Sequence, residues 1–490
     1  MTSRLSAWMK GQDASSAGAD PTSTTAFRRL GWRMFWVGLV VRVLYMTLAH
    51  TYRFRVSEDH FQFGWEMGRI GRALATGYGY ADPFDGHTGP TAWNPPLYPL
   101  LIGGVFRIFG VYTHLSAWVL LTFNSICSAA TAPAIVEIAR RCFAHLPGSG
   151  GKTRDSHSTA SSFSIALWAG WLWTLYPAAM QYAVRWIWDI SLTAFLLTCI
   201  FVIALRVRGI GDPEPPARTL SLWAAFGVLW GLIALSNSSL LLVLPVTGVW
   251  MLGGRGWPSR LKQNLAGAAL AALLCTTCVT PWTVRNYRVF HAFIPSRDNL
   301  GAELDESLKP SNMGFPWGNP LTLNSLNVAR PEFRRYVTLG EAEYLRQRTV
   351  HAKLALADDP GFFRRMTARR FYFYWISVPH PVEQGLLVEL IRELNYAALS
   401  LSGLFGLALA LRKRIPAAGM FAFAFALLPV PYYLITVQAR FRHPLEPLIT
   451  IFTVFLFQSA ERGRWWSSSQ REDSQATHST TAPSTEHTAS

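Results

Sequence analysis

Carboxylates gather early in the chain, in a polar stretch that follows the first apolar run. Glu58, Asp59 and His60 are consecutive, and Glu66 comes seven residues after Asp59. Residues seven apart share one face of a helix, so a helix here would present both acids together. Carboxylates so placed can act as a general base or hold a cation. A solvated loop, in which Glu66 pairs with the neighbouring Arg69, is the other interpretation of the same residues.

A second polar cluster occupies a short connection near the end of the chain. Arg440, Arg442 and His443 fall between two apolar runs. The connection is predicted to be non-cytoplasmic, where short loops usually carry little Lys or Arg. A phosphate group would compensate the charge, because guanidinium groups form paired hydrogen bonds with its oxygens. Contact with lipid headgroups would compensate it as well.

One further acid stands at the start of an apolar run. Asp189 follows Trp186 and Trp188, whose rings suit the interface between membrane and water. The dipole of a helix favours a negative charge at its N-terminus. Asp189 therefore either caps this helix or serves the same site as Glu66.

Recurring apolar runs must position these residues. Half of the 490 residues are apolar and 15% are charged. About 20 apolar residues in a helix cross about 30 Å of hydrocarbon, and a soluble fold could not bury so many runs. We therefore predict an all-α polytopic membrane protein with ten transmembrane helices. The predicted spans are 34–48, 115–138, 163–182, 190–205, 220–235, 240–252, 265–282, 394–411, 420–435 and 445–458.

Basic flanks set the predicted orientation. Arg28 and Arg29 precede the first span, and Arg140 and Arg141 follow the second, as cytoplasmic flanks do. Both termini are then cytoplasmic. Around a transmembrane domain at 30–460, disordered cytoplasmic tails are predicted at 1–29 and 461–490, and substantial outside segments at 50–114 and 284–393.

Both outside segments contain predicted surface helices. Residues 97–109 are interrupted by two glycines and Arg107, and are predicted to form an interfacial helix rather than a span. Pro360–Trp375 is predicted to be an amphipathic helix whose basic and aromatic residues suit an anionic membrane surface. The formal charge of +16 thus serves membrane orientation and lipid contact, and no nucleic-acid partner is expected.

Taken together, these segments resemble the GT-C membrane glycosyltransferases. The likeness points to the family-39-like branch that includes protein O-mannosyltransferases and lipid A aminoarabinose transferases, and it covers roughly residues 30–460. Each motif is loose, but all fall in order on one predicted face of the membrane. They are the acidic first outside loop ending in Leu74–Tyr80, then Asn94–Pro99, Phe109–Gly110, Thr280–Tyr287 and Arg440–Pro444.

The resemblance implies a mechanism and a general base. In that family a carboxylate of the first outside loop activates an acceptor hydroxyl, and arginines hold the phosphate that leaves a polyprenyl-phosphate-linked sugar donor. The position of the family's usual Asp is occupied here by Phe63. Glu66, in the helix that leads to the glycine pair, is the first choice for the base. Asp59 is the second choice, with Glu58 beside it.

The resemblance also implies a binding set. Arg440 and Arg442 match the phosphate ligands, and Arg285 is a further candidate. Asp189 and His443 are expected beside them in substrate binding. No cofactor is certain, although a divalent cation assists some relatives.

The resemblance therefore implies a hexosyl- or pentosyltransferase of the cell inner membrane. It would act among membrane lipids at the periplasmic or outer face, on a lipid, glycan or protein acceptor that the sequence does not identify. A transporter or flippase of a lipid-linked substrate, and an inactive relative that binds lipid carriers, are the alternatives. Transport pathways place ionisable residues in mid-span, and the predicted spans contain few.

Overall fold

The computed structural model describes a helical protein. It describes residues 23–54, 61–144, 154–212, 219–253, 258–309, 313–314, 331–378 and 385–460. Within these ranges the sole β feature is an isolated antiparallel bridge between Ala81 and Pro90. The predicted all-α class is therefore confirmed for the described ranges. Glu58 and Asp59 lie outside them, as do residues 1–22 and the predicted tail at 461–490.

The first half of the chain alternates long helices with short ones at their ends. In chain order they are α2 (Thr24–Leu48), η1 (Phe61–Phe63), α3 (Glu66–Thr76), α4 (Leu97–Phe109), α5 (His114–Phe143), α6 (Arg154–Leu175), α7 (Pro177–Arg185), α8 (Ile190–Val207), α9 (Thr219–Ala234), η2 (Ser238–Val243) and α10 (Leu244–Leu252). The first helix thus begins upstream of the predicted span at 34–48 and includes Arg28 and Arg29.

The second half adds a long helix, a group of polar helices and a final apolar group. In order they are α11 (Leu261–Phe290), α12 (Leu300–Ser307), α13 (Pro331–Leu339), α14 (Glu341–Asp358), α15 (Pro360–Trp375), α16 (Leu386–Arg412), α17 (Ala418–Leu427), α18 (Val430–Leu434) and η4 (Ala439–Leu445), followed by a helix over 446–460. The helices predicted at 97–109 and at Pro360–Trp375 are both present with those bounds.

Four described helices are long and apolar enough to cross a membrane. They are α5, α8, α11 and α16. Five further apolar helical stretches are shorter, at Leu97–Phe109, Ser162–Leu175, Thr219–Ala234, Ser238–Leu252 and Ala418–Leu434. The membrane-protein character is supported by these helices, whereas the count of ten spans stays a prediction.

Prolines divide two of the predicted spans. The stretch 163–182 is not one helix, because α6 ends at Leu175 and α7 starts at Pro177. The stretch 420–435 is divided in the same way between α17 and α18, with Pro429 capping the second helix. Proline has no N–H to donate to the preceding turn and its ring clashes there. Apolar periodicity alone predicted each pair as a single helix.

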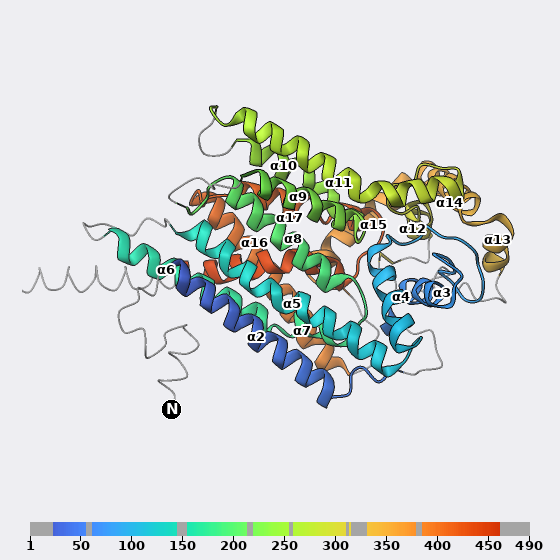
Figure 1. Ribbon diagram of the computed structural model, residues 1–490, viewed down its shortest axis with the longest axis horizontal. Coiled ribbons are helices and arrows are strands. Elements are labelled where there is room, and N and C mark those ends of the chain that lie inside the picture. Colours follow the sequence, from blue (N-terminus) through green and yellow to red (C-terminus); the bar gives the residue numbers. More distant parts are fainter. Residues whose placement is uncertain are drawn as a thin grey trace, which may run out of the picture.

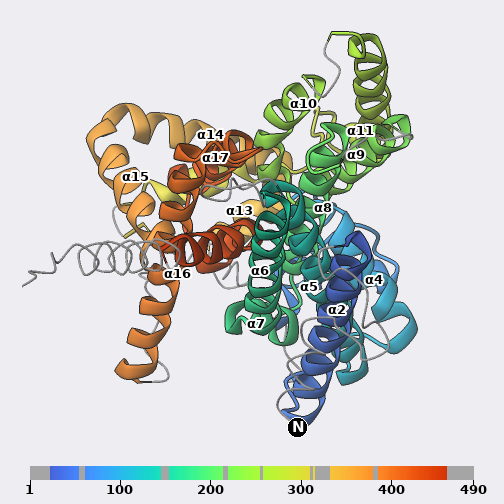
Figure 2. The same ribbon diagram turned by 90° about the vertical axis from the view of Figure 1, so that its left-hand side faces the viewer.

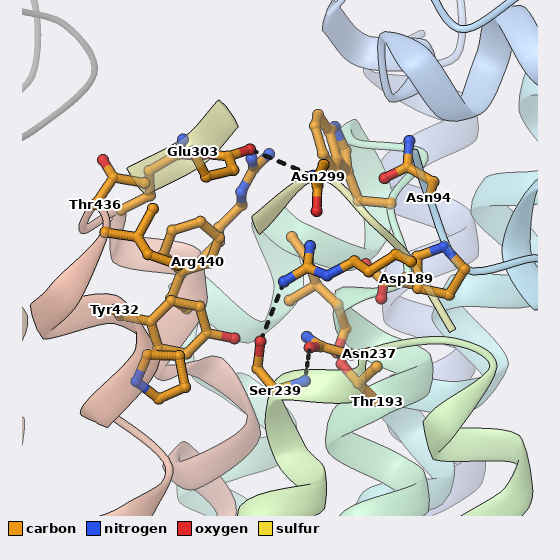
Figure 3. Close-up of a pocket in the computed structure, with 18 of the residues that line it drawn as sticks. Asn94, Asp189, Thr193, Asn237, Ser239, Asn299, Glu303, Tyr432, Thr436 and Arg440 are labelled. Carbon is orange, nitrogen blue, oxygen red and sulfur yellow. Dashed lines mark hydrogen bonds between the residues drawn. The ribbon is translucent and has the colours of Figure 1, made fainter. Parts of the chain in front are cut away.

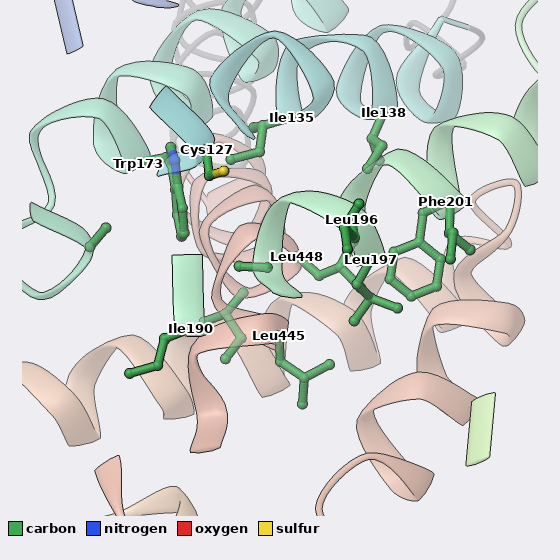
Figure 4. Packing of buried hydrophobic residues seen from close by; sticks show 14 of the residues in the cluster. Cys127, Ile135, Ile138, Trp173, Ile190, Leu196, Leu197, Phe201, Leu445 and Leu448 are labelled. Carbon is green, nitrogen blue, oxygen red and sulfur yellow. The ribbon is translucent and has the colours of Figure 1, made fainter. Parts of the chain in front are cut away.

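The apolar core is built around α5. This helix packs against α2, α6, α7 and α8. Figure 4 shows Cys127 and Ile135 of α5 near Trp173 of α6, and Leu196 of α8 belongs to the same buried cluster. Leu445 and Leu448 enter the same cluster from the end of the chain. The N-terminal and C-terminal helices therefore share one core.

One charge in the predicted first span is buried rather than lipid-facing. Arg42 of α2 is fully buried, and its guanidinium donates to the carbonyls of Gly38, at 3.1 Å, and Thr174, at 2.9 Å. Buried charges persist where backbone acceptors compensate the loss of water. Arg42 thereby joins α2 to the end of α6.

The long helices run roughly along one direction, and the short polar helices gather at one end of them. Figure 1 shows α2, α5, α8 and α11 extending from the left-hand end of the view towards the end occupied by α3, α4, α12, α13 and α14. Two packed pairs make up much of that far end, α3 with α4 and α12 with α14. Both predicted outside segments thus lie at the same end of the molecule.

Candidate active site

A cavity opens where these end elements meet the long helices. It has a volume of about 180 Å³. Its walls come from α3, from the connection between α7 and α8, from η2, from α12 and from the segment between α18 and η4. The polar residues of the wall are Glu66, Asn94, Asp189, Thr193, Ser236, Asn237, Ser239, Arg297, Asn299, Glu303, Glu306, Ser307, Tyr432, Thr436, Gln438 and Arg440.

Glu66 reaches this cavity because the first outside loop is fastened to the connection before α8. The N–H of Ile187 donates to the carbonyl of Gln62 at 2.8 Å. Gly64 has φ +82°, and a Cβ there would stand 2.6 Å from the carbonyl oxygen of Ile187. Only glycine adopts this backbone conformation at such close approach without strain. The loop can therefore press against residue 187 and start α3 at Glu66, on the wall of the cavity that Asp189 also lines.

Burial changes the acidity of both carboxyl groups. It raises the pKa of Glu66 to about 7, although Arg69 and Arg440 oppose the rise. Burial likewise raises the pKa of Asp189 to about 6, against the opposing effect of Arg440. The Ser236 hydroxyl donates to Asp189 at 3.3 Å. Two carboxyl groups in one cavity thus titrate near neutral pH, where a general base is most effective.

Arg440 supplies a positive charge to the same cavity. Its guanidinium lies over the ring of Trp188, 3.7 Å from the centroid, and 5.3 Å from that of Phe441. Burial lowers the pKa of Arg440 to about 10, so the group stays protonated at neutral pH. Its Nη1 atom is buried and has no hydrogen-bond partner among the described residues. The charge is positioned by aromatic rings and keeps a donor for an anion.

The remaining charged wall comes from the second outside segment. Glu303 and Glu306 lie one turn apart on α12, and Arg297 precedes that helix. The Arg297 guanidinium donates to Ser239 at 3.3 Å. Figure 3 shows Glu303, Asp189 and Arg440 around the cavity, each from a different part of the chain. The sequence analysis did not predict α12. The signal that could have indicated it is the close spacing of acidic residues within Leu300–Ser307.

Contacts before and behind α12 hold this helix at the cavity. The backbone N–H of Asp298, just before the helix, donates to the carbonyl of Ala92 at 3.3 Å. Behind the helix, Arg348 of α14 forms an ion pair with buried Asp305 at 2.5 Å. The same arginine lies 3.7 Å from Glu306, the next residue, which lines the cavity, so Arg348 supports both acids of α12.

Arg442 and His443 do not line the cavity. Both are fully buried, and both bind Glu446, Arg442 at 3.0 Å and His443 at 2.6 Å. Arg442 also donates to the carbonyl of Tyr396 at 2.9 Å, and the ring of His443 stacks on Trp173. The structure thus commits this predicted pair to an internal network that joins η4 to α16 and α6.

Arg285 also lies apart from the cavity wall. Its guanidinium donates to the carbonyls of Thr91, at 2.7 Å, and Tyr80, at 2.8 Å, and to Asn286 at 3.0 Å. It fastens the end of α11 to the first outside loop. Of the predicted site residues, the cavity therefore brings together Glu66, Asp189 and Arg440. Phe63, at the position of the family's usual Asp, is buried in the core.

The described residues show no ready-made metal site. Within the described ranges, no group of three or more His, Cys, Asp or Glu side chains is arranged to hold a metal ion. The four carboxylates of the cavity line its wall without converging on one point. No chemical step is therefore assigned to a cation.

Comparisons with known proteins find likeness in structure alone. No protein-family model matches the chain, and no curated protein matches it significantly. The Archaeoglobus fulgidus oligosaccharyltransferase in its apo form is 13% identical, with a TM-score of 0.50 over 90% of this chain and 52% of that one. The same enzyme with an inhibitory peptide and a dolichol-phosphate is 12% identical, with a TM-score of 0.48 over 93% of this chain and 52% of that one.

A second kind of solved protein is also similar. ArnT from Cupriavidus metallidurans, bound to undecaprenyl phosphate, is 15% identical, with a TM-score of 0.35 over 88% of this chain and 78% of that one. The chain spans about half the length of the oligosaccharyltransferase that it matches. Of these likenesses, the one to the apo oligosaccharyltransferase shows that this chain shares the fold of that protein, in keeping with the resemblance that the motifs predict.

Proposed function

We propose that this chain is a glycosyltransferase that moves a sugar from a polyprenyl-phosphate-linked donor to an acceptor hydroxyl. One observation carries the proposal, which is that Glu66 and Arg440 line a single cavity. The first is a carboxyl group that titrates near neutral pH, and the second is a cation with a donor left for an anion. Transfer from a phosphate carrier needs both kinds of group.

The proposed reaction uses them in one displacement. The Glu66 carboxylate takes the proton of the acceptor hydroxyl, and the acceptor oxygen forms a bond to the anomeric carbon. The bond between that carbon and the phosphate oxygen breaks, and the phosphate leaves with the electron pair. Arg440 stabilises the added negative charge, which is the way fixed cations lower such barriers. No proton is needed on the leaving phosphate.

Asp189 has a supporting place in this proposal. It lines the cavity beside Trp188, on whose ring the Arg440 guanidinium stacks. Its carboxylate offsets part of the Arg440 charge while the donor site is empty. Asp189 would take the role of base if Glu66 proved dispensable.

The rest of the cavity suits a sugar. Hydroxyl and amide groups of Asn237, Ser239 and Gln438 line the wall together with the ring of Tyr432. Sugars are bound by hydrogen bonds to such polar groups and by packing against aromatic rings. A hexosyl or pentosyl group fits this chemistry, and the acceptor class stays open among lipid, glycan and protein.

The proposed setting is the inner membrane, with the cavity at the outer or periplasmic face. The orientation follows from the basic flanks, because Arg140 and Arg141 lie at the opposite end of α5 from the cavity elements. Polyprenyl-phosphate sugars and surrounding membrane lipids are the expected partners.

Comparative mass spectrometry tests the proposal directly. Envelope glycans and lipids are compared between cells that carry the wild-type chain, cells that lack it and cells that carry Glu66→Gln or Arg440→Gln. We expect one glycan or lipid to lose a sugar when the chain is absent and in both variants. Identical profiles in all four strains, with the proteins present in the membrane, would exclude the transferase. Flux of a lipid-linked sugar without a covalent product would favour the transporter alternative.

A further inference from the structure

Helix α15 carries four arginines and no acidic residue. Arg364, Arg365, Arg369 and Arg370 all fall within Pro360–Trp375. The helix starts cleanly, because the Asp359 side chain accepts from the N–H of Phe362 at 2.8 Å. None of these arginines lines the cavity. The proposed reaction therefore leaves this basic helix without a role.

Three of these arginines point outwards and one inwards. Arg364, Arg365 and Arg369 are exposed, and so are Phe371 and Tyr372, at 55% and 52%. These positions recur at intervals of three, four and seven, which places them on one side of the helix. Figure 2 shows α15 at the edge of the molecule, away from the core helices α2 and α5. This exposed face of α15, basic in its first half and aromatic in its second, is referred to below as the basic face.

The basic face differs from other charged surfaces of the outside segment. On α14, Arg346 is paired with Glu343 at 2.7 Å. On α15, only Arg365 has an acidic neighbour among the described residues, Asp359 at 3.5 Å, and both of those side chains are largely exposed. The basic face thus holds positive charge that the described protein does not neutralise.

We propose that the basic face binds the anionic headgroups of the lipid bilayer. Charge complementarity carries the argument, together with the exposed rings of Phe371 and Tyr372, since aromatic side chains prefer the headgroup level of a membrane. A helix with basic and aromatic residues on its exposed face lies in the plane of such an interface. The occupant is the bilayer surface, and the inference stands whether or not the proposed reaction is correct.

The buried arginine connects this face to the cavity. Arg370 is fully buried and donates to the carbonyl of Ser307, at 2.7 Å, and to that of Leu434, at 3.1 Å. Ser307 lines the cavity at the end of α12, and Leu434 directly precedes the lining residues Ile435 and Thr436. Arg370 therefore ties two cavity walls to α15. Docking of α15 on the lipid surface holds both walls in place.

Hydrogen exchange of the full chain in nanodiscs tests the binding. Exchange of the amides of residues 360–375 is measured in phosphatidylcholine alone and with part of it replaced by phosphatidylglycerol. We expect slower exchange with the anionic lipid, and loss of the difference at high salt, because salt screens exposed charges. Lipid affinity changes by about fivefold per arginine near an anionic surface. The triple variant Arg364→Gln, Arg365→Gln, Arg369→Gln should therefore bind the anionic headgroups on the order of a hundredfold more weakly than the wild type.

A matched variant distinguishes binding by the arginines of α15 from a general effect of positive charge on the protein surface. Arg334→Gln, Arg335→Gln, Arg346→Gln removes the same charge from exposed positions on α13 and α14, and should keep the lipid-dependent protection. Equal exchange of wild-type α15 in the two lipids would overturn the proposal, even if the triple variant failed to fold. Equal loss in the matched variant would also overturn it. Protection by inorganic phosphate in phosphatidylcholine alone would assign the arginines to a free anion instead.

Discussion

The guanidinium of Arg440 lies 3.7 Å from the centre of the ring of Trp188, which is the residue before Asp189. This contact joins the last outside connection of the chain to the connection that precedes α8. It positions the cation without consuming all of its hydrogen-bond donors, since Nη1 has no partner among the described residues. Stacking of an arginine on an aromatic face is the arrangement that leaves its donors available for an anion.

Replacement of Arg440 should abolish most activity while leaving the fold intact. We expect Arg440→Gln to lower kcat/KM by about 10²–10³-fold, the usual effect of removing one group that stabilises a developing negative charge. Arg440→Lys should recover part of the loss, because it keeps the charge but not the planar group that stacks on Trp188. Sugar transfer by the purified protein in nanodiscs measures both.

The control for this prediction is an arginine outside the cavity. Arg107 is exposed on α4 and does not line the cavity. Arg107→Gln should retain wild-type transfer. Equal activity of Arg440→Gln and wild type would remove the proposed phosphate ligand.

The pH dependence of transfer should report Glu66. Burial raises the pKa of Glu66 to about 7, and only the carboxylate form can accept a proton. Below pH 7 the group is mostly protonated, so kcat/KM should fall about tenfold per pH unit and should level off above pH 7. Glu66→Gln should lose the activity, and the inflection near pH 7 in the profile of kcat/KM should disappear with it. A profile of the same shape in Glu66→Gln would show that another group, such as Asp189, is the base.

Several features of the fold follow from local sequence patterns. The helices at 97–109 and at Pro360–Trp375 have the predicted bounds, because prolines, glycines and apolar periodicity act within a few residues. Prolines also limited the prediction, since Pro177 and Pro429 break helices that apolar periodicity alone would continue.

The candidate site was only partly predictable, for two physical reasons. The approach of α12 depends on long-range contacts, such as the one from Asp298 to Ala92, which no local pattern encodes. Arg440 and Arg442 were predicted as a pair, but they lie in η4, a 3₁₀ helix. With three residues per turn, positions two apart point in different directions. Arg440 therefore faces the cavity while Arg442 faces the core.

A methyl group at position 64 should disturb the site through the backbone. Gly64→Ala places a side chain at φ +82° and 2.6 Å from the Ile187 carbonyl oxygen. Strained backbone of this kind costs of order 1–3 kcal/mol, and the clash adds to it. We expect a lower thermal midpoint and a lower kcat. Gly104→Ala, inside α4 at a position with no neighbouring atom within 4 Å, is the control and should lower neither the thermal midpoint nor kcat, because alanine favours a helix.

The two arginines of η4 should differ in what their loss does. Arg442 is fully buried against Glu446, and removal of one partner of a buried ion pair typically costs about 3–5 kcal/mol. Arg442→Gln should therefore lower the thermal midpoint of the protein in detergent strongly. Arg440 stacks on Trp188 and has no ion pair among the described residues, so Arg440→Gln should change that midpoint little while it abolishes transfer.

A double variant distinguishes a broken pair from a general defect. Arg442→Met combined with Glu446→Gln removes both charges of the pair, so neither is left alone in the core. Because the cost of breaking a buried pair comes mostly from the charge left behind, the double variant should be more stable than Arg442→Gln. If the double variant keeps transfer activity, Arg442 acts only in the fold. Strong loss of transfer in a double variant with a normal thermal midpoint would instead return Arg442 to the phosphate site that the sequence predicted.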